Sequence, residues 1–351
     1  MLSGGFLSTP LDGVAVNVFF ALSGYWIARL WDATYSTLPS PISTFYVSRA
    51  WRIFPLALIG SLVMVPLAGF PVGPETLLAN AFLITLAGPH IDVLDPPAWS
   101  LAIEVQFYLA APLILGMMRS ARWTLILVAL GAISWLLFAF MLIGASLQVF
   151  LLYFLAGVLY ARGVIPQPTP RLVNVGLVLF LVFGLLANAF LPLMDKGPSL
   201  RLYLLALTMT VLPFAAQSVG RHSSERDRML GDLAFPVYVI HWPMFALTRL
   251  MFTHWVLPAV IGTAAVSWLL WALVDRLSEQ RRRQFIARRK FDGRGGIGAI
   301  DWTVHAPQLS GDQVARGVPR CLAGDAQIIV SQLCANPSSG TGEPQNTASR
   351  A

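Results

Sequence analysis

The sequence predicts an all-α fold, a polytopic transmembrane helix bundle of about nine spans with one short interfacial or re-entrant segment. Of its 351 residues, 56% are hydrophobic and only 12% are charged, whereas a soluble domain carries about 25% charged residues. The apolar residues fall in blocks of about twenty, the length that crosses a bilayer. Despite a formal net charge of +7, this composition excludes a soluble single-domain enzyme, a disordered protein and a nucleic-acid-binding protein.

Nine segments have the hydropathy of membrane spans, although the fifth of them is short. They are 14–31, 52–70, 99–118, 123–142, 147–162, 172–193, 201–220, 232–251 and 256–276. A further apolar stretch, 75–88, has only fourteen residues, too few to cross about 30 Å of hydrocarbon unaided. We therefore expect this stretch to lie at the interface or to re-enter the membrane.

The basic residues set the expected topology. They form five clusters in alternate loops, and the loops between these clusters are acidic, neutral or nearly so. Nine spans with a non-spanning 75–88 segment put all five clusters on one side, which the positive-inside rule makes the cytoplasm. We thus predict a multi-pass protein of the inner (plasma) membrane, with its N-terminus outside and its C-terminus cytoplasmic.

The same pattern divides the chain into four regions. Residues 1–13 form a short external leader without the features of a signal peptide, and 14–278 form the transmembrane domain. The basic segment 279–291 either rests on anionic headgroups or only enforces the topology. Residues 292–351, polar and rich in small residues, are predicted to be a disordered cytoplasmic tail. An odd number of spans behind a polar leader indicates a bundle that lacks its first helix.

Glu104 and His241 are the first candidates for chemistry, because ionisable residues inside spans are costly. Helical spacing places Ser100 and Tyr108 on the same face as Glu104. This carboxylate either holds the bundle together or acts in substrate binding or proton handling. His241 lies in a span with two prolines, and such helices commonly line a cavity. Its imidazole either bonds to a neighbouring helix or exchanges protons near neutral pH.

Arg49 and Arg52 form a second candidate site at the cytoplasmic entrance of the second span. Three residues apart, they share a helix face and could clamp a polyanion with bidentate hydrogen bonds. Ordinary positive-inside flanking is the alternative. Both cysteines of the sequence, Cys321 and Cys334, lie in the tail, so no disulfide framework is indicated, and no metal site or phosphate-binding loop is predicted.

Four segments, in order, resemble the integral-membrane acyltransferase family 3, which acylates sugars of the cell envelope and related acceptors. These segments are GVAVNVFFALSGYWIARLW (13–31), FYVSRAWRIFPL (45–56) with its Arg-x-x-Arg, WSLAIEVQFYLAAPL (99–113) and FPVYVIHWPMF (235–245). Each motif alone is moderately specific, but together they extend over residues 13–276.

The resemblance implies a bundle of ten spans that moves an acyl group from cytosolic acyl-CoA to a hydroxyl presented near the outer face. The expected donor is acetyl-CoA, and the acceptor is a carbohydrate or glycolipid. Arg49 and Arg52 would contact the acyl-CoA, and Glu104 and His241 would be catalytic. The family's signatures imply that Trp99, Ser100 and Tyr108 shape the substrate cavity and that Phe19, Phe20, Ser23 and Gly24 serve helix packing around it.

Three departures from the family pattern bear on this expectation. The family's first helix, with a basic residue about eleven positions before a histidine, has no counterpart here. The aspartate of the first signature is replaced, since the chain reads Val14-Ala15-Val16-Asn17, and Asp275 is followed by Arg276 rather than by proline. We therefore hypothesise that the chain as written has impaired catalysis. His241 would then be a substitute base or, as we favour, a supporting residue.

Two other classes stay open from the sequence. An inactive membrane scaffold of the same fold would keep the motifs without the chemistry. A small-solute transporter would also use intramembrane Glu and His, but the sequence shows no internal repeat of the kind that transporters carry.

Overall fold

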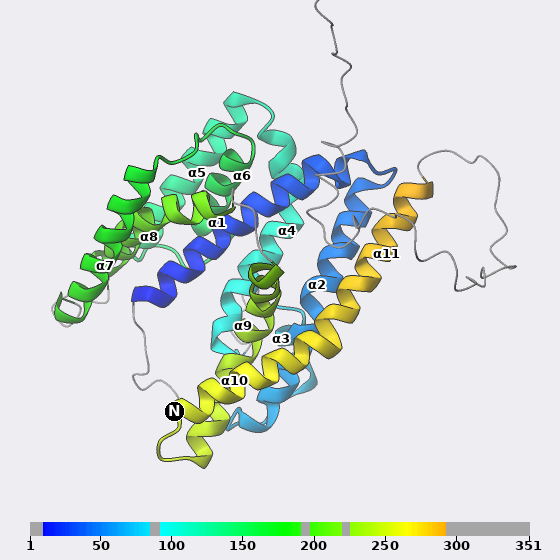
Figure 1. The fold of residues 1–351 in the computed structure, drawn as a ribbon, viewed down its shortest axis with the longest axis vertical. Helices are drawn as coiled ribbons and strands as arrows, with labels where there is room; N and C mark the ends of the chain where they lie inside the picture. The colour runs from blue at the N-terminus through cyan, green and yellow to red at the C-terminus, as the bar shows by residue number, and fades with distance from the viewer. Residues whose placement is uncertain (1–9, 85–91, 191–196, 220–224, 293–351) are drawn as a thin grey trace, which may run out of the picture. The chain divides into compact units, whose positions relative to one another are not determined.

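Helices make up all the regular structure in the parts of the chain that the computed structural model describes, residues 10–84, 92–190, 197–219 and 225–292 (Figure 1). The α-helices are α1 (Pro10–Ala33), α2 (Pro41–Met64), α3 (Pro74–Ala81), α4 (Trp99–Met117), α5 (Ala121–Ala139), α6 (Leu147–Ala161), α7 (Pro170–Phe190), α8 (Pro198–Val219), α9 (Glu225–Met251), α10 (Val256–Leu270) and α11 (Arg276–Asp292). Short 3₁₀ turns precede or follow several of them, namely η1 (Tyr35–Thr37), η2 (Val65–Leu67) and η4 (Pro96–Ala98), and a π-helical segment, η6 (Trp271–Asp275), joins α10 to α11. The all-α polytopic fold is thus confirmed.

Each of the nine predicted spans overlaps a helix in the described residues. Within the described residues, seven helical stretches are long and apolar enough to cross a membrane, and α6 and Pro170–Leu186 of α7 are shorter apolar helices. The count of nine spans therefore stays a prediction. Most of the predicted leader and tail, residues 1–9 and 293–351, lies outside the described residues.

The predicted non-spanning segment 75–88 overlaps α3, a helix of eight residues. At 1.5 Å of rise per residue such a helix is about 12 Å long, which is less than half the thickness of the hydrocarbon layer. A helix of this length is too short to cross the membrane, but residues 85–88 of the predicted segment lie outside the described residues, so its non-spanning, interfacial placement stays a prediction.

The helix that contains the second predicted span begins before residue 52, because α2 starts at Pro41; the start of the span itself stays a prediction. Proline is favoured in the first turn of a helix, where its missing N–H is not needed. The polar and aromatic residues between Pro41 and Arg52 do not look like a membrane span, yet they continue the same helix. Arg49 and Arg52 consequently lie in the middle of α2, and their position at the cytoplasmic entrance of the span stays a prediction.

The helix of the last predicted span also continues beyond residue 276, while the end of the span itself stays a prediction. Through the π-helical segment η6, α10 continues into α11, which contains the basic segment 279–291. Arginine, glutamate and glutamine are good helix formers, and Glu279 pairs with Arg282 and Arg283, three and four residues further on. Such pairs stabilise a helix, so this polar sequence remains helical. It lies along α2 (Figure 1).

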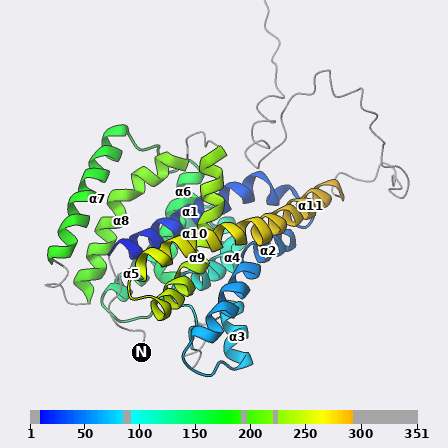
Figure 2. The same ribbon diagram turned by 60° about the horizontal axis from the view of Figure 1, so that its bottom comes forward.

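Close packing of α1 on α6 organises the centre of the bundle (Figure 2). A Cβ atom on Gly24 would lie 2.1 Å from the carbonyl oxygen of Phe154, and one on Gly157 would lie 1.9 Å from that of Ala21. Only glycine permits this approach of two backbones, the way small residues act in membrane helix packing. The expectation that Gly24 serves packing agrees with this contact.

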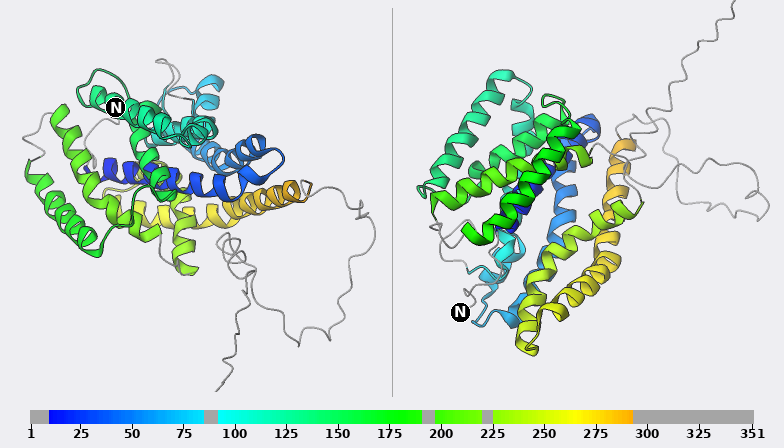
Figure 3. Two further views of the ribbon diagram at one scale, coloured as in Figure 1. Left: turned by 90° about the horizontal axis from the view of Figure 1, so that it is seen from above. Right: turned by 60° about the vertical axis from the view of Figure 1, so that its left-hand side comes forward.

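The remaining contacts place α2 between α3, α4, α9 and α11, while α9 packs on α10 and α7 on α8 (Figure 3). Aromatic side chains fill the space beside the α1–α6 crossing. The rings of Phe107 and Phe154 stack with centroids 4.0 Å apart, and Phe20 lies 4.8 Å from Phe154. This core brings α1, α2, α4 and α9 together, and each of them carries candidate site residues.

Candidate active site

Glu104 lies on α4, where this helix contacts α1. Its side chain is only 4% exposed, and its Oε1 accepts a hydrogen bond from the hydroxyl of Tyr108, one turn further along α4. The same oxygen accepts a second hydrogen bond, of 2.9 Å, from the Oγ of Ser23 on α1. The shared helix face predicted for Glu104 and Tyr108 is therefore observed. Ser23, which we expected to serve packing only, is a polar partner of this carboxylate.

Arg49 is a buried cation on α2 with few polar partners. It is 7% exposed, and its Nη2 donates a 3.0 Å hydrogen bond to the hydroxyl of Tyr35. Its guanidinium carbon lies 5.7–5.8 Å from the ring centroids of Tyr35, Phe45 and Tyr108, a cation–π environment. Its buried Nε has no hydrogen-bond partner among the described residues. Since buried donors are normally paired, this group marks a place where a ligand atom could bind.

Arg52, one turn further along α2, is partly buried. Arg49 and Arg52 both lie within electrostatic range of Glu104, and Arg52 also lies within range of Asp275 in the π-helical segment. The structure thus brings together three of the residues predicted from the sequence. It adds Asp275 to this group. Asp275 is the acidic residue that is followed by Arg276 where the family pattern has a proline.

His241 lies on α9, and its tautomer follows from one contact. Its Nδ1 lies 2.6 Å from the backbone carbonyl oxygen of Tyr238. A carbonyl only accepts hydrogen bonds, so Nδ1 carries the proton when the ring is neutral. The lone pair then resides on Nε2, the atom that can accept a proton.

Tyr238 connects His241 to α4. Its hydroxyl lies 2.5 Å from the Oγ of Ser100 and also donates to the carbonyl oxygen of Pro97. Tyr238 is within electrostatic range of both Glu104 and Asp95. His241 is therefore connected to the Glu104 region through Tyr238.

Asp95 is a candidate site residue that the sequence reasoning missed. It precedes η4 and is 6% exposed, and its buried Oδ1 has no hydrogen-bond partner within the described parts of the chain. Aspartate commonly caps a helix at this position, yet this side chain makes no capping bond. Burial raises the pKa of the Asp95 carboxyl to about 7. An acidic residue directly before Pro96-Pro97 and a predicted span was the available signal.

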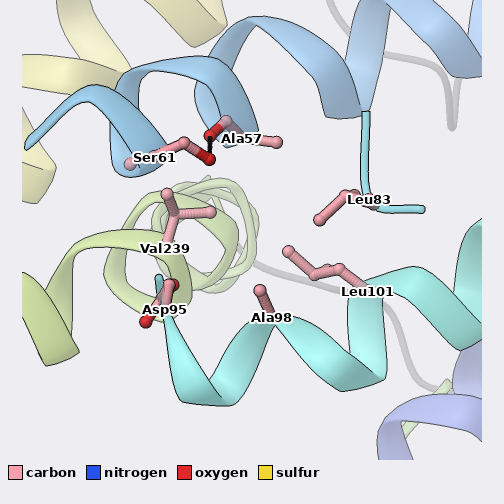
Figure 4. Close-up of a pocket in the computed structure, with 8 residues that line it drawn as sticks. Ala57, Ser61, Leu83, Asp95, Ala98, Leu101 and Val239 are labelled. Atoms are coloured by element: carbon pink, nitrogen blue, oxygen red, sulfur yellow. Dashed lines mark hydrogen bonds between the residues drawn. The ribbon is translucent and has the colours of Figure 1, made fainter. Parts of the chain in front are cut away.

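Asp95 lines a small pocket with a few residues of α2, α4 and α9 (Figure 4). The pocket holds about 10 Å³, enough for one water-sized group. Its other lining residues are small or apolar except Ser61, whose hydroxyl donates to the carbonyl oxygen of Ala57. Asp95 thus provides the open hydrogen-bond acceptor of this pocket.

The three residues expected to shape a substrate cavity have other neighbours. Ser100 contacts Tyr238, and Tyr108 contacts Glu104. Trp99 packs against Phe20 and Phe150, with ring centroids 6.5 and 5.5 Å away. The lining of the Asp95 pocket contains none of the three, so their contact with substrate stays a prediction. In the part of the chain that the structure covers, no three His, Cys, Asp or Glu side chains gather in a way that could hold a metal ion.

Comparison with known proteins assigns this arrangement to a family. The family model described as "acyltransferase domain" matches residues 2–274, which include every candidate site residue described above except Asp275. No solved structure gives a significant match.

Three characterised relatives share parts of the sequence. Nodulation protein 10 of Rhizobium leguminosarum is 23% identical over 347 residues, an alignment that covers 81% of this chain and 89% of the relative. The peptidoglycan O-acetyltransferase OatA of Listeria monocytogenes is 24% identical over 286 residues, 67% of this chain and 45% of the relative. The acyltransferase MdmB of Streptomyces mycarofaciens is 33% identical over 124 residues, 30% of this chain and 29% of the relative.

The alignments with the last two proteins span less than half of their length, whereas the family model matches most of this chain. That match, the helical bundle and the apolar spans together confirm the resemblance carried by the four motifs. The chain belongs to acyltransferase family 3 and is a multi-pass membrane enzyme that transfers acyl groups.

Proposed function

We propose that the protein is an O-acyltransferase that takes an acyl group, with acetyl expected, from cytosolic acyl-CoA and places it on a hydroxyl of a cell-envelope or exported sugar. One relative is named as a peptidoglycan O-acetyltransferase and another as an acyltransferase. The first of these names supports a carbohydrate acceptor for this chain.

The single observation that carries the proposal is the environment of Arg49. A guanidinium group that is 7% exposed, with a buried Nε lacking a partner in the described residues, lies on the same helix as Arg52. Arginine binds phosphate through a planar fork of N–H donors. The phosphates of acyl-CoA would supply the acceptors that Arg49 lacks.

The reaction forms an ester from a thioester. The acceptor hydroxyl oxygen attacks the thioester carbonyl carbon while a base removes the hydroxyl proton. The C–S bond then breaks, and the thiolate leaves and takes up a proton. Such a base contributes about 10²- to 10⁴-fold to the rate. We assign the base to Nε2 of His241, in place of the supporting role that the sequence favoured, because Nδ1 is committed to the carbonyl of Tyr238 and Nε2 keeps its lone pair.

Glu104 would serve the donor side of the reaction. It lies in electrostatic range of Arg49 and Arg52 and accepts hydrogen bonds from Ser23 and Tyr108. In this proposal the carboxylate fixes the positions of the two arginines, so that the thioester lies between them and His241. With the predicted topology, the donor would enter from the cytoplasmic end of α2, and the acceptor would approach from the opposite side.

Acyl transfer from radiolabelled acetyl-CoA by the purified full chain in proteoliposomes tests the proposal. Glu104→Gln and Arg52→Ala should abolish transfer, and His241→Asn should lower it about 100-fold or more, because asparagine keeps a donor near the Nδ1 position without a basic nitrogen. Arg122→Ala is the matched control, since it removes an exposed arginine away from the site.

Each variant should retain the thermal stability of the wild type within a few degrees, so that a loss of transfer reports on chemistry. Wild-type activity that survives Arg52→Ala and Glu104→Gln would contradict the assigned roles. A wild-type protein that transfers no acyl group from any acyl-CoA to any envelope glycan would contradict the proposed function itself.

A further inference from the structure

Helix α11 lies beyond the residues matched by the family model, which end at 274, and still contacts α2. Figure 3 shows it as the continuation of α10, reaching along the bundle. The helix is rich in arginine, but Arg282 alone among its described basic residues is buried, at 7% exposure. Burial of one arginine on a polar helix calls for a specific partner, because a buried charge is costly unless it is paired.

Arg282 and Arg49 meet on one buried pair of hydroxyl groups. Nη1 of Arg282 donates to the Oγ of Ser48 at 3.2 Å, and this oxygen lies 2.7 Å from the hydroxyl of Tyr35. The Tyr35 hydroxyl in turn accepts the 3.0 Å hydrogen bond from Nη2 of Arg49. Two cations that are 233 positions apart in the sequence are thus joined through two side chains.

Both bridging hydroxyls are fully inside the protein, with Ser48 at 0% and Tyr35 at 1% exposure. Guanidinium groups only donate hydrogen bonds, so each hydroxyl oxygen must accept from its arginine. The chain Arg282–Ser48–Tyr35–Arg49 therefore has donors at both ends, and it fixes the two guanidinium groups relative to each other.

Glu279 supplies the counter-charge of Arg282. Its two oxygens accept hydrogen bonds of 2.6 Å each from Nε and Nη2 of Arg282, and one of them also accepts a 2.8 Å bond from Nε of Arg283. This two-pronged contact occupies the Nε and Nη2 donors of Arg282 and fixes the plane of its guanidinium. Glu279 thus orients this cation, one hydroxyl pair away from Arg49.

We infer that Arg282 is a third cationic contact for the phosphate groups of the acyl donor, supplied by α11 and held toward α2 by Glu279. This inference rests on the proposed function, since it names a further part of the same donor site. The ligand class is a phosphate-bearing thioester, and the recognition depends on the charge of the donor and not on its acyl group.

Two donors separate a phosphate contact from a purely structural role of Arg282. Acetyl-CoA carries phosphates, whereas S-acetylpantetheine presents the same thioester without them. In the purified full chain, Arg282→Gln should raise the KM for acetyl-CoA about tenfold or more, with kcat nearly unchanged. It should leave kcat/KM for S-acetylpantetheine unchanged. An equal loss with both donors, or no loss with either, would overturn the inference.

Further variants protect the test against misfolding. Arg281→Gln removes the neighbouring, exposed arginine and should leave both donors unaffected. Glu279→Gln should raise the dissociation constant for CoA about threefold, because Arg282 then loses the carboxylate that orients it toward α2. Unchanged or tighter CoA binding by Glu279→Gln would also overturn the inference.

Two outcomes separate a failure of this inference from a failure of the proposed function. A wild type that uses acetyl-CoA, together with an Arg282→Gln variant of unchanged KM, removes Arg282 from the donor site and leaves the proposed function standing. A wild type that neither binds CoA nor transfers its acyl group overturns both.

Discussion

The buried carboxyl of Asp95 should make the stability of the protein depend on pH. Burial raises its pKa from 3.8 to about 7, so the folded state binds more protons than the unfolded state between these two values. Stability must therefore fall as pH rises through this window. A change of about three pKa units at about 1.4 kcal/mol each gives a total loss of about 4 kcal/mol, and roughly 3 kcal/mol of it should occur between pH 5 and pH 8.

The assay is thermal unfolding of the detergent-purified protein at several pH values between 5 and 8. Asp95→Asn keeps the shape of the side chain and cannot ionise, so it should be more stable than the wild type at pH 8 and approach it at pH 5. Asp92→Asn, at an exposed neighbouring position, is the control and should follow the wild type throughout. If the stability of Asp95→Asn depends on pH as fully as that of the wild type, burial does not raise the pKa of this carboxyl and the reasoning fails.

Three further predictions concern helix packing. Gly157→Ala should cost about 3 kcal/mol or more of stability, because its Cβ would lie 1.9 Å from a backbone oxygen. Gly116→Ala is the control and should be tolerated, because a Cβ there has nothing within 4 Å. Equal unfolding midpoints of the two variants would contradict this prediction. Tyr238→Phe should cost about 1 kcal/mol of stability, because it removes the hydroxyl contacts to Ser100 and Pro97. An unchanged unfolding midpoint would show that these contacts do not stabilise the protein. Arg162→Gln should cost about 1 kcal/mol, since its 3.1 Å ion pair with Asp32 is only partly buried, and a much larger fall of the unfolding midpoint would contradict this estimate.

Local contacts in the site could be predicted from the sequence. Glu104 and Tyr108 are four residues apart, and helical periodicity alone puts them on one face. Their hydrogen bond is observed. The four motifs likewise predicted the family, because each is a short continuous segment whose residues need no knowledge of the three-dimensional arrangement.

Contacts between distant segments could not be predicted. Ser23 and Glu104 are 81 positions apart, and Ser48 and Arg282 are 234 positions apart. No periodicity relates them, since which helices pack together depends on the whole bundle. The start of α2 was missed for a related reason. The polar residues before Arg52 look unlike a membrane span, and α11 lies against α2 and buries Arg282 beside Ser48.

The π-helical segment η6 has a consequence for insertions and deletions. Each residue of an α-helix turns the chain by about 100°, so a deletion within α10 would rotate Arg282 away from Ser48. A π-helical turn, by contrast, contains about one residue more than an α-helical turn. Removing one residue from Trp271–Asp275 could convert that turn to regular α-helix without rotating α11. In this enzyme the join between α10 and α11 is therefore the position at which a change of length should be absorbed most easily.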